Sequence, residues 1–169
     1  EGDWHKIRRI VCSKEIKAEK DLDEVLAKVS DNAITFLDED YALALKQIYC
    51  PPFVLFYKGD KKILTESSKF LSVVGSRQHP DIAGELTQNI IAELQEGVTI
   101  VSGLAIGIDT VAHRAAIANG KKTIAVLGCG VNLCYTVSNR DVYEEIQKNH
   151  LIISEYPDFV EPKPENFPF

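Results

Sequence analysis

Small and polar residues follow four apolar segments of the chain, and they are residue types that suit phosphate binding. They are Gly75, Ser76 and Arg77, then Ser102 and Gly103, then Gly128 and Gly130, and finally Ser154 and Glu155. Glycine lets a backbone approach an anion closely, and an arginine guanidinium can bind a phosphate through two hydrogen bonds. Any one of these glycines can instead serve only a tight turn. Four such segments, one with an arginine, favour an anion site.

Asp109 and His113 are a second candidate for chemistry, because residues four apart share one face of a helix. An aspartate that orients an imidazole could form an acid–base pair. The alternative is that both residues are structural. Asp109 would then cap the helix and accept hydrogen bonds from loop amides, and His113 would make a buried hydrogen bond against the sheet. No serine or cysteine stands in a nucleophile motif such as G-x-S-x-G. We therefore expect a binding protein and not an enzyme.

The sequence patterns of nucleotide cofactors and metal sites are missing. The first of the four segments reads "GSRQHP" in place of G-x-G-x-x-G, which argues against NAD. The stretch "GKKT" at Gly120 lacks the upstream glycine of a P-loop and runs from a helix into a strand. Cys129 and Cys134 form one C-x4-C pair without a second pair or nearby histidines. We expect no cofactor and no metal.

From residue 70 onward, alternating strand and helix patterns position these residues. Strands are predicted at residues 70–74, 98–102, 123–127 and 151–154, with helices between them at 81–97, 108–119 and 139–148. Single helices between strands require parallel crossovers. The predicted fold class is α/β, an extended Rossmann-like, doubly wound, mostly parallel sheet preceded by a small helical module. The carboxyl ends of the parallel strands should meet at one edge, where ligands of such sheets bind.

Finer features of the helices are also predicted. Ile82, Leu86, Ile90 and Leu94 form one apolar stripe on the first helix, and Asn139 can cap the last one. Before residue 70, a helical pattern starts at Asp21 and recurs in "DEDYALALKQIY" at residues 38–49, after a break near residues 30–35. "PPFVLFYKGD" predicts a short strand, and "KKILTESSK" a polar linker.

These patterns divide the chain into three predicted parts. They are a partial helical N-terminal module at residues 1–50, a strand and linker at 51–69, and a Rossmann-like domain at 70–169. The absence of methionine and the proline-rich stretch at the end lead us to expect a piece of a longer protein.

Charge and hydropathy limit the classes of partner. The formal net charge is -6, from 19 basic and 25 acidic residues. Nonspecific wrapping of duplex DNA usually needs a basic face, so any site for a polyanion must be local. No apolar run approaches the roughly 20 residues that span a bilayer. We expect a cytoplasmic protein without a membrane contact.

Several motifs, in order and spacing, resemble the DNA-processing protein A family, known as DprA or Smf. They are "VVGSR", "VSGLAIGIDTVAH", "GKKTIAVLGCGVNLCY" followed by Asn139, and "LIISEYP" followed by "NFP". The likeness runs from about Tyr41 to Phe169. It implies that residues 70–169 form a DNA-binding domain, truncated at its C-terminal end, that binds single-stranded DNA without known catalysis. It also implies a homodimer that hands the strand to RecA recombinase during natural transformation.

The resemblance further implies which residues form a phosphate pocket. They are Gly75, Ser76 and Arg77, then Ser102, Gly103, Gly107 and Asp109, then Gly128, Gly130 and Asn139, with His113 supporting the pocket from behind. The chain departs from the family at Ile106, where a basic residue is frequent, and at Thr136, where proline is usual. The family also continues past "NFP" with an arginine-rich segment, so we expect weaker DNA binding from a chain that ends at Phe169.

Two alternatives share the Rossmann-like plan. One is a nucleotide-processing enzyme similar to the cytokinin-activating phosphoribohydrolases, but their P-G-G-x-G-T signature is absent and "LGCGVN" is the nearest stretch. The other is a module that senses a small nucleotide. Thermal stabilisation by mononucleotides would support either alternative, whereas stabilisation by oligonucleotides alone would count against both.

Overall fold

The computed structural model describes residues 32–166, which contain one six-stranded sheet. The strands are β1 (Ala33–Thr35), β2 (Val54–Gly59), β3 (Lys69–Ser72), β4 (Val98–Ser102), β5 (Thr123–Leu127) and β6 (Leu151–Ser154). Their order in the sheet is β1-β2-β6-β5-β4-β3. Strands β3 to β6 are parallel, β2 is antiparallel to β6, and β1 is antiparallel to β2. The predicted α/β class with a mostly parallel sheet is confirmed.

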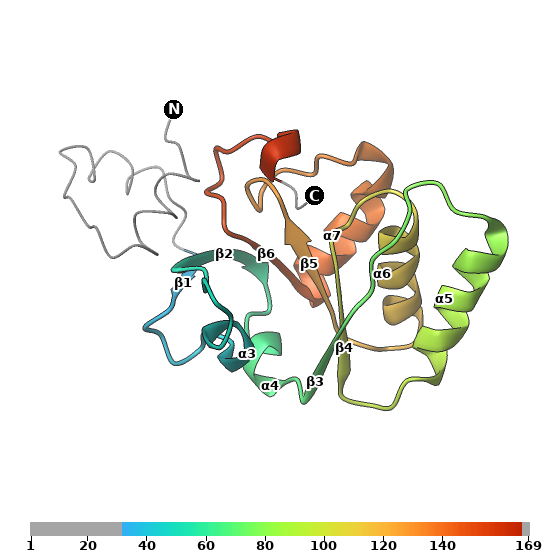
Figure 1. Ribbon diagram of the computed structural model, residues 1–169, viewed down its shortest axis with the longest axis horizontal. Coiled ribbons are helices and arrows are strands. Elements are labelled where there is room, and N and C mark those ends of the chain that lie inside the picture. The colour runs from blue at the N-terminus through green and yellow to red at the C-terminus, as the bar shows by residue number, and fades with distance from the viewer. Residues whose placement is uncertain (1–31, 167–169) are drawn as a thin grey trace.

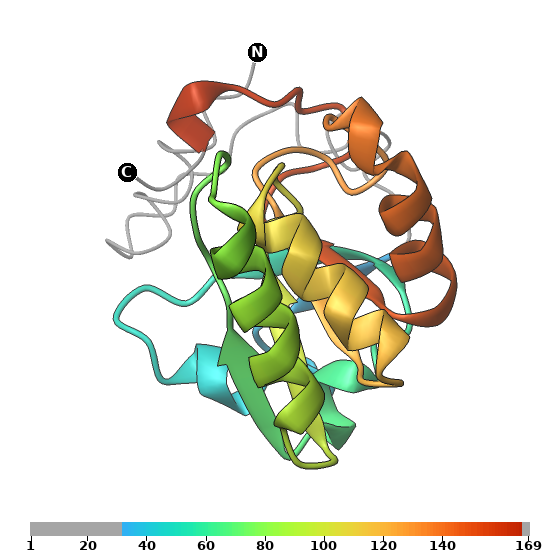
Figure 2. The same ribbon diagram turned by 90° about the vertical axis from the view of Figure 1, so that its right-hand side faces the viewer.

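Three long helices connect the parallel strands. They are α5 (Asp81–Glu93), α6 (Ile108–Ala118) and α7 (Arg140–Asn149). Because β3, β4, β5 and β6 follow one another in space as in sequence, the three helices share one face of the sheet, where Figure 2 shows them side by side. The short helices α3 (Leu43–Lys46) and α4 (Ile63–Glu66) lie toward the other face (Figure 1). Two 3-10 turns, η1 (Val137–Asn139) and η2 (Pro164–Asn166), complete the helical elements of residues 32–166.

The core lies on both faces of the sheet. On β6, Ile152 belongs to the cluster beneath α7, together with Ile146. Its neighbours Leu151 and Ile153 belong to a second cluster, with Tyr41 and the residues of α4. A strand buried on both faces has no polar side to show, which explains the continuous apolar run "LII". A third cluster, under α5 and α6, comprises Ile91, Ile100, Ala112, Ala115 and Ala116.

The strand predictions agree closely with the structure. β4, β5 and β6 have the predicted bounds, and β3 begins one residue early and ends two residues early. The strand predicted within residues 51–60 is β2, which pairs with β6 in the same sheet as the core. The predicted linker at residues 61–69 is partly wrong, because it contains α4. The division of the chain into three parts stays a prediction.

The helix predicted at residues 38–49 is wrong, since α3 has only four residues. The Asp38 carboxylate accepts a hydrogen bond from the Thr35 amide at 2.7 Å, which forms a turn instead. The buried Tyr41 hydroxyl donates to the Pro52 carbonyl at 2.6 Å, and Ala42 is extended with ψ 120°. A helix therefore cannot begin before residue 43. The helix predicted from Asp21 precedes residue 32 and so lies outside the described residues.

Most of the apolar stripe predicted on α5 does not face the core, and only Leu94 at its end packs against the third cluster. Ile82, Leu86 and Ile90 are 73%, 58% and 49% exposed, whereas Gly84 and Ile91 are the buried residues of this helix. α5 is the outermost of the three helices and packs against α6, so only a narrow strip of it is covered (Figure 2). The i, i+4 spacing identified a helix correctly but selected its outer side.

The two adjacent isoleucines of α5 test this assignment. Ile91→Ala should lower the free energy of unfolding by about 2–5 kcal/mol, because it opens a cavity in a fully buried position. Ile90→Ala should change it by less than about 0.5 kcal/mol, because Ile90 is half exposed. Urea unfolding of both variants measures the difference, and equal losses would contradict the assignment.

Candidate nucleic-acid interface

Three loops meet at the carboxyl edge of the parallel strands. The first loop (residues 73–80) follows β3, the second loop (residues 103–107) follows β4, and the third loop (residues 128–139) follows β5. All ten residues of the predicted phosphate pocket lie in these loops or next to them, at the end of β4 and in the first turn of α6. The structure therefore brings the predicted residues to one edge.

The first and second loops pack directly against each other. A Cβ on Gly75 would lie 2.7 Å from the Cβ of Ile108, and one on Gly107 would lie 2.7 Å from the Cα of Arg77. Gly107 has φ +93°, a conformation that side chains rarely adopt. The Ile108 amide donates to the Ser76 carbonyl at 3.2 Å, so this amide at the start of α6 is already bonded within the protein. Glycine at both positions is required by this contact.

Two predicted site residues hold the ends of β3 and β4. The hydroxyl of Ser102, 3% exposed, donates to the Val73 carbonyl at 2.6 Å. The carboxylate of Asp109, 8% exposed, accepts the Gly103 amide at 3.1 Å. Both polar groups are engaged inside the protein, which makes them part of the support for the loops.

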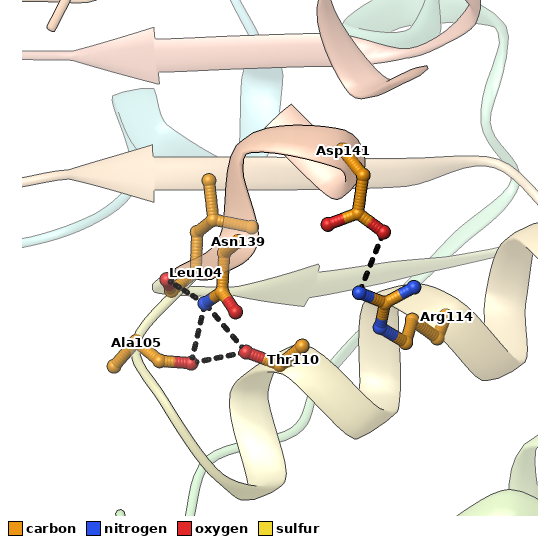
Figure 3. A network of polar contacts seen from close by, with 6 residues as sticks. All are labelled: Leu104, Ala105, Thr110, Arg114, Asn139 and Asp141. Atoms are coloured by element: carbon orange, nitrogen blue, oxygen red, sulfur yellow. Dashed lines mark hydrogen bonds and ion pairs between the residues drawn. The ribbon is translucent and has the colours of Figure 1, made fainter. Parts of the chain in front are cut away.

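Asn139 joins the third loop to the second (Figure 3). Its side-chain amide donates to the Leu104 carbonyl at 3.0 Å, to the Ala105 carbonyl at 3.3 Å and to the Thr110 hydroxyl at 2.6 Å. The Thr110 hydroxyl in turn donates to the Ala105 carbonyl at 2.6 Å. The prediction that Asn139 caps α7 is wrong in its chemistry. Asn139 occupies the N-cap position, but its side chain makes no capping bond because it serves the second loop.

An ion pair connects α6 to α7 beside this network. The Arg114 guanidinium lies 2.6 Å from the Asp141 carboxylate, as Figure 3 shows. Its hydrogen bond lowers the pKa of Asp141 below the usual value. Both side chains are more than half exposed, so solvent and salt weaken the attraction. The pair links the middle of α6 to the start of α7 and adds little to stability.

His113 is a buried structural residue behind the second loop. Its Nδ1 lies 2.7 Å from the Thr123 hydroxyl, and that hydroxyl donates to the Ile100 carbonyl at 3.0 Å. The Thr123 oxygen must therefore accept, so Nδ1 carries the proton. Burial, with a smaller effect from His150, lowers the pKa of His113 to about 3. Asp109 and His113 thus have separate partners, and the structure supports their structural interpretation over an acid–base pair.

Both glycines of the third loop are buried, and Gly130 lies beneath another segment of the chain. Gly128 and Gly130 are buried, and the Gly130 amide donates to the Val160 carbonyl at 2.9 Å. A Cβ on Gly130 would lie 2.6 Å from the Cα of Asp158. Gly130 thus permits close packing of the third loop under residues 158–160.

Ser76 and Arg77 are the predicted polar side chains that remain at the surface. The Ser76 hydroxyl accepts the Gln78 amide at 3.1 Å and donates to the Gln78 carbonyl, which shapes the first loop. Arg77 is exposed and has no hydrogen bond or ion pair within residues 32–166. Ile106, 54% exposed, lies on the second loop, which packs against the first. Of the predicted site residues, Arg77 is therefore the cation left at the surface, and the apolar Ile106 is exposed on the neighbouring loop.

Sequence reasoning missed the partners of Asn139 and the ion pair. Thr110 could have been suspected, because a hydroxyl in the first turn of a helix can bond a loop carbonyl. The pairing of Arg114 with Asp141 has no signal in the sequence, since α6 and α7 meet only in the fold. Among the described residues, no group of three or more histidine, cysteine or acidic side chains could hold a metal ion.

Known proteins match the chain over this fold and these loops. The family model of DNA recombination-mediator protein A matches residues 32–169. The DNA processing protein DprA of Streptococcus pneumoniae is 41% identical over 138 residues, which are 80% of this chain and 48% of that protein. The DprA of Bacillus subtilis is 35% identical over 138 residues, 81% of this chain and 46% of that protein. Protein Smf of Synechocystis is 41% identical over 134 residues, 78% of this chain and 34% of that protein.

Two solved structures have the same fold. The X-ray structure of DprA from Streptococcus pneumoniae superimposes with a TM-score of 0.81 and 32% identity, over 98% of this chain and 60% of that one. A structure that reports the single-stranded DNA binding mode of DNA processing protein A from Helicobacter pylori gives a TM-score of 0.69 and 30% identity, over 80% of this chain and 60% of that one.

The fold, the loops and these matches place the chain in the DNA recombination-mediator protein A family, whose curated members are named DprA or Smf. The resemblance read from the motifs is confirmed. The chain spans about half the length or less of the curated relatives named above. Within residues 32–166, no helix is long and apolar enough to cross a membrane.

Gly107→Ala tests the contact between the first two loops. The new Cβ would collide with the backbone of Ser76 and Arg77 at a positive φ, so we expect a loss of more than about 2 kcal/mol in the free energy of unfolding. Gly120→Ala is the matched control, because Gly120 also has a positive φ but no atom within 4 Å of its Cβ. It should cost only about 1–2 kcal/mol of backbone strain. Equal urea midpoints for the two variants would contradict the contact.

The buried His113 predicts a dependence of stability on pH. Because its folded pKa of about 3 lies below its ordinary 6.5, the folded state favours the neutral ring. Its contribution is complete above pH 6.5 and is lost as pH falls toward 3, with a slope approaching about 1.4 kcal/mol per pH unit. His113→Asn, which keeps a donor for Thr123, should reduce the slope between pH 6.5 and 5 by about one proton. Urea unfolding at several pH values gives the slope of the unfolding free energy against pH for each protein. Equal slopes for wild type and His113→Asn would contradict this role of His113.

Proposed function

We propose that the chain is the single-stranded-DNA-binding part of a recombination mediator. The observation that carries the proposal is Arg77, an exposed guanidinium without a partner in the described residues, on a loop held by the Gly107 and Ile108 contacts. An arginine whose loop is already fixed can bind a phosphate with little ordering cost. Membership of the family supports the same ligand, and so does the single-stranded DNA binding mode that the Helicobacter pylori structure reports for its own protein.

The proposed contacts divide the predicted residues into two groups. Ser76 and Arg77 contact phosphates from the surface of the first loop, with Gly75 allowing close approach. The other residues position that surface. Ser102, Asp109, Gly128, Gly130 and Asn139 are buried, and Gly103 and Gly107 are half-buried. His113 supports the second loop from beneath the sheet edge. Phosphate contacts carry no base information, so binding should tolerate any sequence.

The charge distribution favours a single strand over a duplex. The net charge of -6 repels a rigid duplex that must bring many phosphates near the surface at once. A flexible strand can place one or two phosphates at Arg77 and direct its bases toward the apolar Ile106. Ile106 adds no charge where relatives of the family often carry a basic residue. We therefore expect a shallow salt dependence, near -0.7 in log–log slope for each phosphate contact.

The wider role is part of the same proposal. We infer a cytoplasmic protein that acts by binding and not by catalysis, because Asp109 and His113 have structural partners. A homodimer that protects the incoming strand and loads RecA recombinase during natural transformation is the role that family membership supports. RecA transfer and dimer formation rest on that membership and not on a contact described above.

Removal of the Arg77 charge tests the DNA site. Arg77→Ala should weaken binding of a short labelled oligo-dT about three- to tenfold and reduce the magnitude of the salt slope by about 0.7, measured by fluorescence anisotropy at two salt concentrations. Lys148→Ala is the matched control, because it removes an exposed cation in the last turn of α7, at the end of the helix away from the third loop. An unlabelled duplex of the same length should compete poorly.

Either of two results would contradict this site. One is equal weakening by Lys148→Ala, which would reduce binding to net charge alone. The other is oligo-dT binding with an unchanged salt slope in Arg77→Ala. Thermal stabilisation by mononucleotides in place of oligonucleotides would favour a small-nucleotide sensor.

The RecA step has its own test. In a mixture with RecA, ATP and single-stranded DNA, added protein should raise the initial rate of RecA filament formation, and Arg77→Ala should raise it less. The rate is followed by the fluorescence of a labelled strand. Strand binding without any acceleration would remove RecA loading from the proposal and leave DNA binding in place.

A further inference from the structure

A groove of about 620 Å³ lies between α7 and the third loop, and no residue of the second loop lines it. Residues 132–135 of the third loop form one wall, and α7 contributes Arg140, Tyr143 and Gln147. The volume lies in the range of small-molecule sites. None of the ten residues assigned to the phosphate pocket lines it, but the third loop borders both places.

Two tyrosines line the groove, and one of them, Tyr143, is held in a fixed position. The Tyr143 hydroxyl donates to the Val131 carbonyl at 2.6 Å, which anchors the third loop to α7. Burial raises the pKa of Tyr143 to about 12, so this donor stays protonated. The Lys58 ammonium lies 5.8 Å from the Tyr143 ring centroid, and Tyr135 lines the same groove. Aromatic rings in a fixed position are the usual stacking partners of unpaired nucleobases.

Gln147 supplies an unsatisfied hydrogen-bond acceptor in the groove. Its Oε1 is buried and has no hydrogen-bond partner among the described residues. Buried polar atoms are nearly always paired, and an unpaired one costs free energy. A ligand that donates a hydrogen bond here would remove this cost after rotation of the terminal amide. Every nucleobase has an N–H donor on its pairing edge, so such a contact does not select one base.

The charges of the groove match one nucleotide and not a run of phosphates. Lys58 and Arg140 are offset by Glu144 and Glu161. Arg140, the first residue of α7, is exposed and makes no ion pair within residues 32–166. It can take a single phosphate at the rim while the base lies inward.

We propose that this groove binds one nucleotide, with the base between Tyr135 and Gln147 and its phosphate at Arg140. The inference rests on the proposed function, because the nucleotide would belong to the DNA strand that binds there. That strand would be held at the first loop and would cross the third loop. A free mononucleotide has the same chemistry, and the experiment separates the two sources.

The test uses an oligo-dT with one 2-aminopurine, a fluorescent base that is quenched when it stacks. Wild-type protein should quench it on binding, and anisotropy of the same strand reports overall affinity. Gln147→Met and Tyr135→Leu should each lower the quenching at least about twofold, with affinity reduced by no more than about tenfold. Gln88→Met, the same change on the exposed side of α5, is the control and should behave as wild type. Gln147→Met should also be at least as stable as wild type to urea, because it removes an unpaired acceptor.

Each outcome decides the proposal. Strand binding with equal quenching in all variants would overturn the groove and leave the proposed function intact. If no strand binds, the proposed function fails. The groove is then tested by titration with dAMP, followed through the NMR signals of the Gln147 side-chain amide. A shift of those signals that saturates, with the signals of Gln88 unmoved, would establish a site for a free nucleotide. Unmoved Gln147 signals would overturn the groove as well.

Discussion

The packing of Gly107 against the backbone of Ser76 and Arg77 is the contact on which the candidate site depends. It joins two loops from different strands, and it works only because Gly107 has no side chain and a positive φ. The Ile108 amide, bonded to the Ser76 carbonyl, fixes the same pair of loops. Without this contact Arg77 would sit on a loop free to move, and an ordered phosphate contact would cost more conformational entropy.

Most polar groups at the sheet edge satisfy one another and leave few for a ligand. Ser102, Asp109 and Asn139 are buried and bonded to loop backbone, so they determine where the surface lies. The exposed Arg77 then faces solvent from the first loop. The third loop borders the α7 groove, which Gln147 also lines. The Oε1 atom of Gln147 has no hydrogen-bond partner in the described part of the chain. One loop thus separates the proposed phosphate contact at Arg77 from the groove proposed for a base.

The sequence predicted the sheet well because buried parallel strands are short apolar runs between helices, as in β4, β5 and β6. It failed where a single side-chain contact overrides a periodic pattern. Tyr41 and Asp38 form a turn where the pattern indicated a helix, and α5 covers Ile91 while the more regular stripe faces solvent. The motifs named candidate residues that the fold brings to one edge of the sheet. Whether each is exposed or bonded within the protein depends on tertiary contacts. Asn139 is the clearest case, since its cap position was predicted and its partners on the second loop were not.

The most direct measurement is chemical-shift mapping of ¹⁵N-labelled protein with a short oligo-dT. The account predicts the largest amide shifts at Ser76, Arg77 and Gln78 on the first loop, with smaller shifts along residues 132–135. Amides at the opposite edge of the sheet, such as Gly97 and Gly120, should not move. Shifts confined to that opposite edge, or saturation at the same strand concentration in Arg77→Ala, would contradict it.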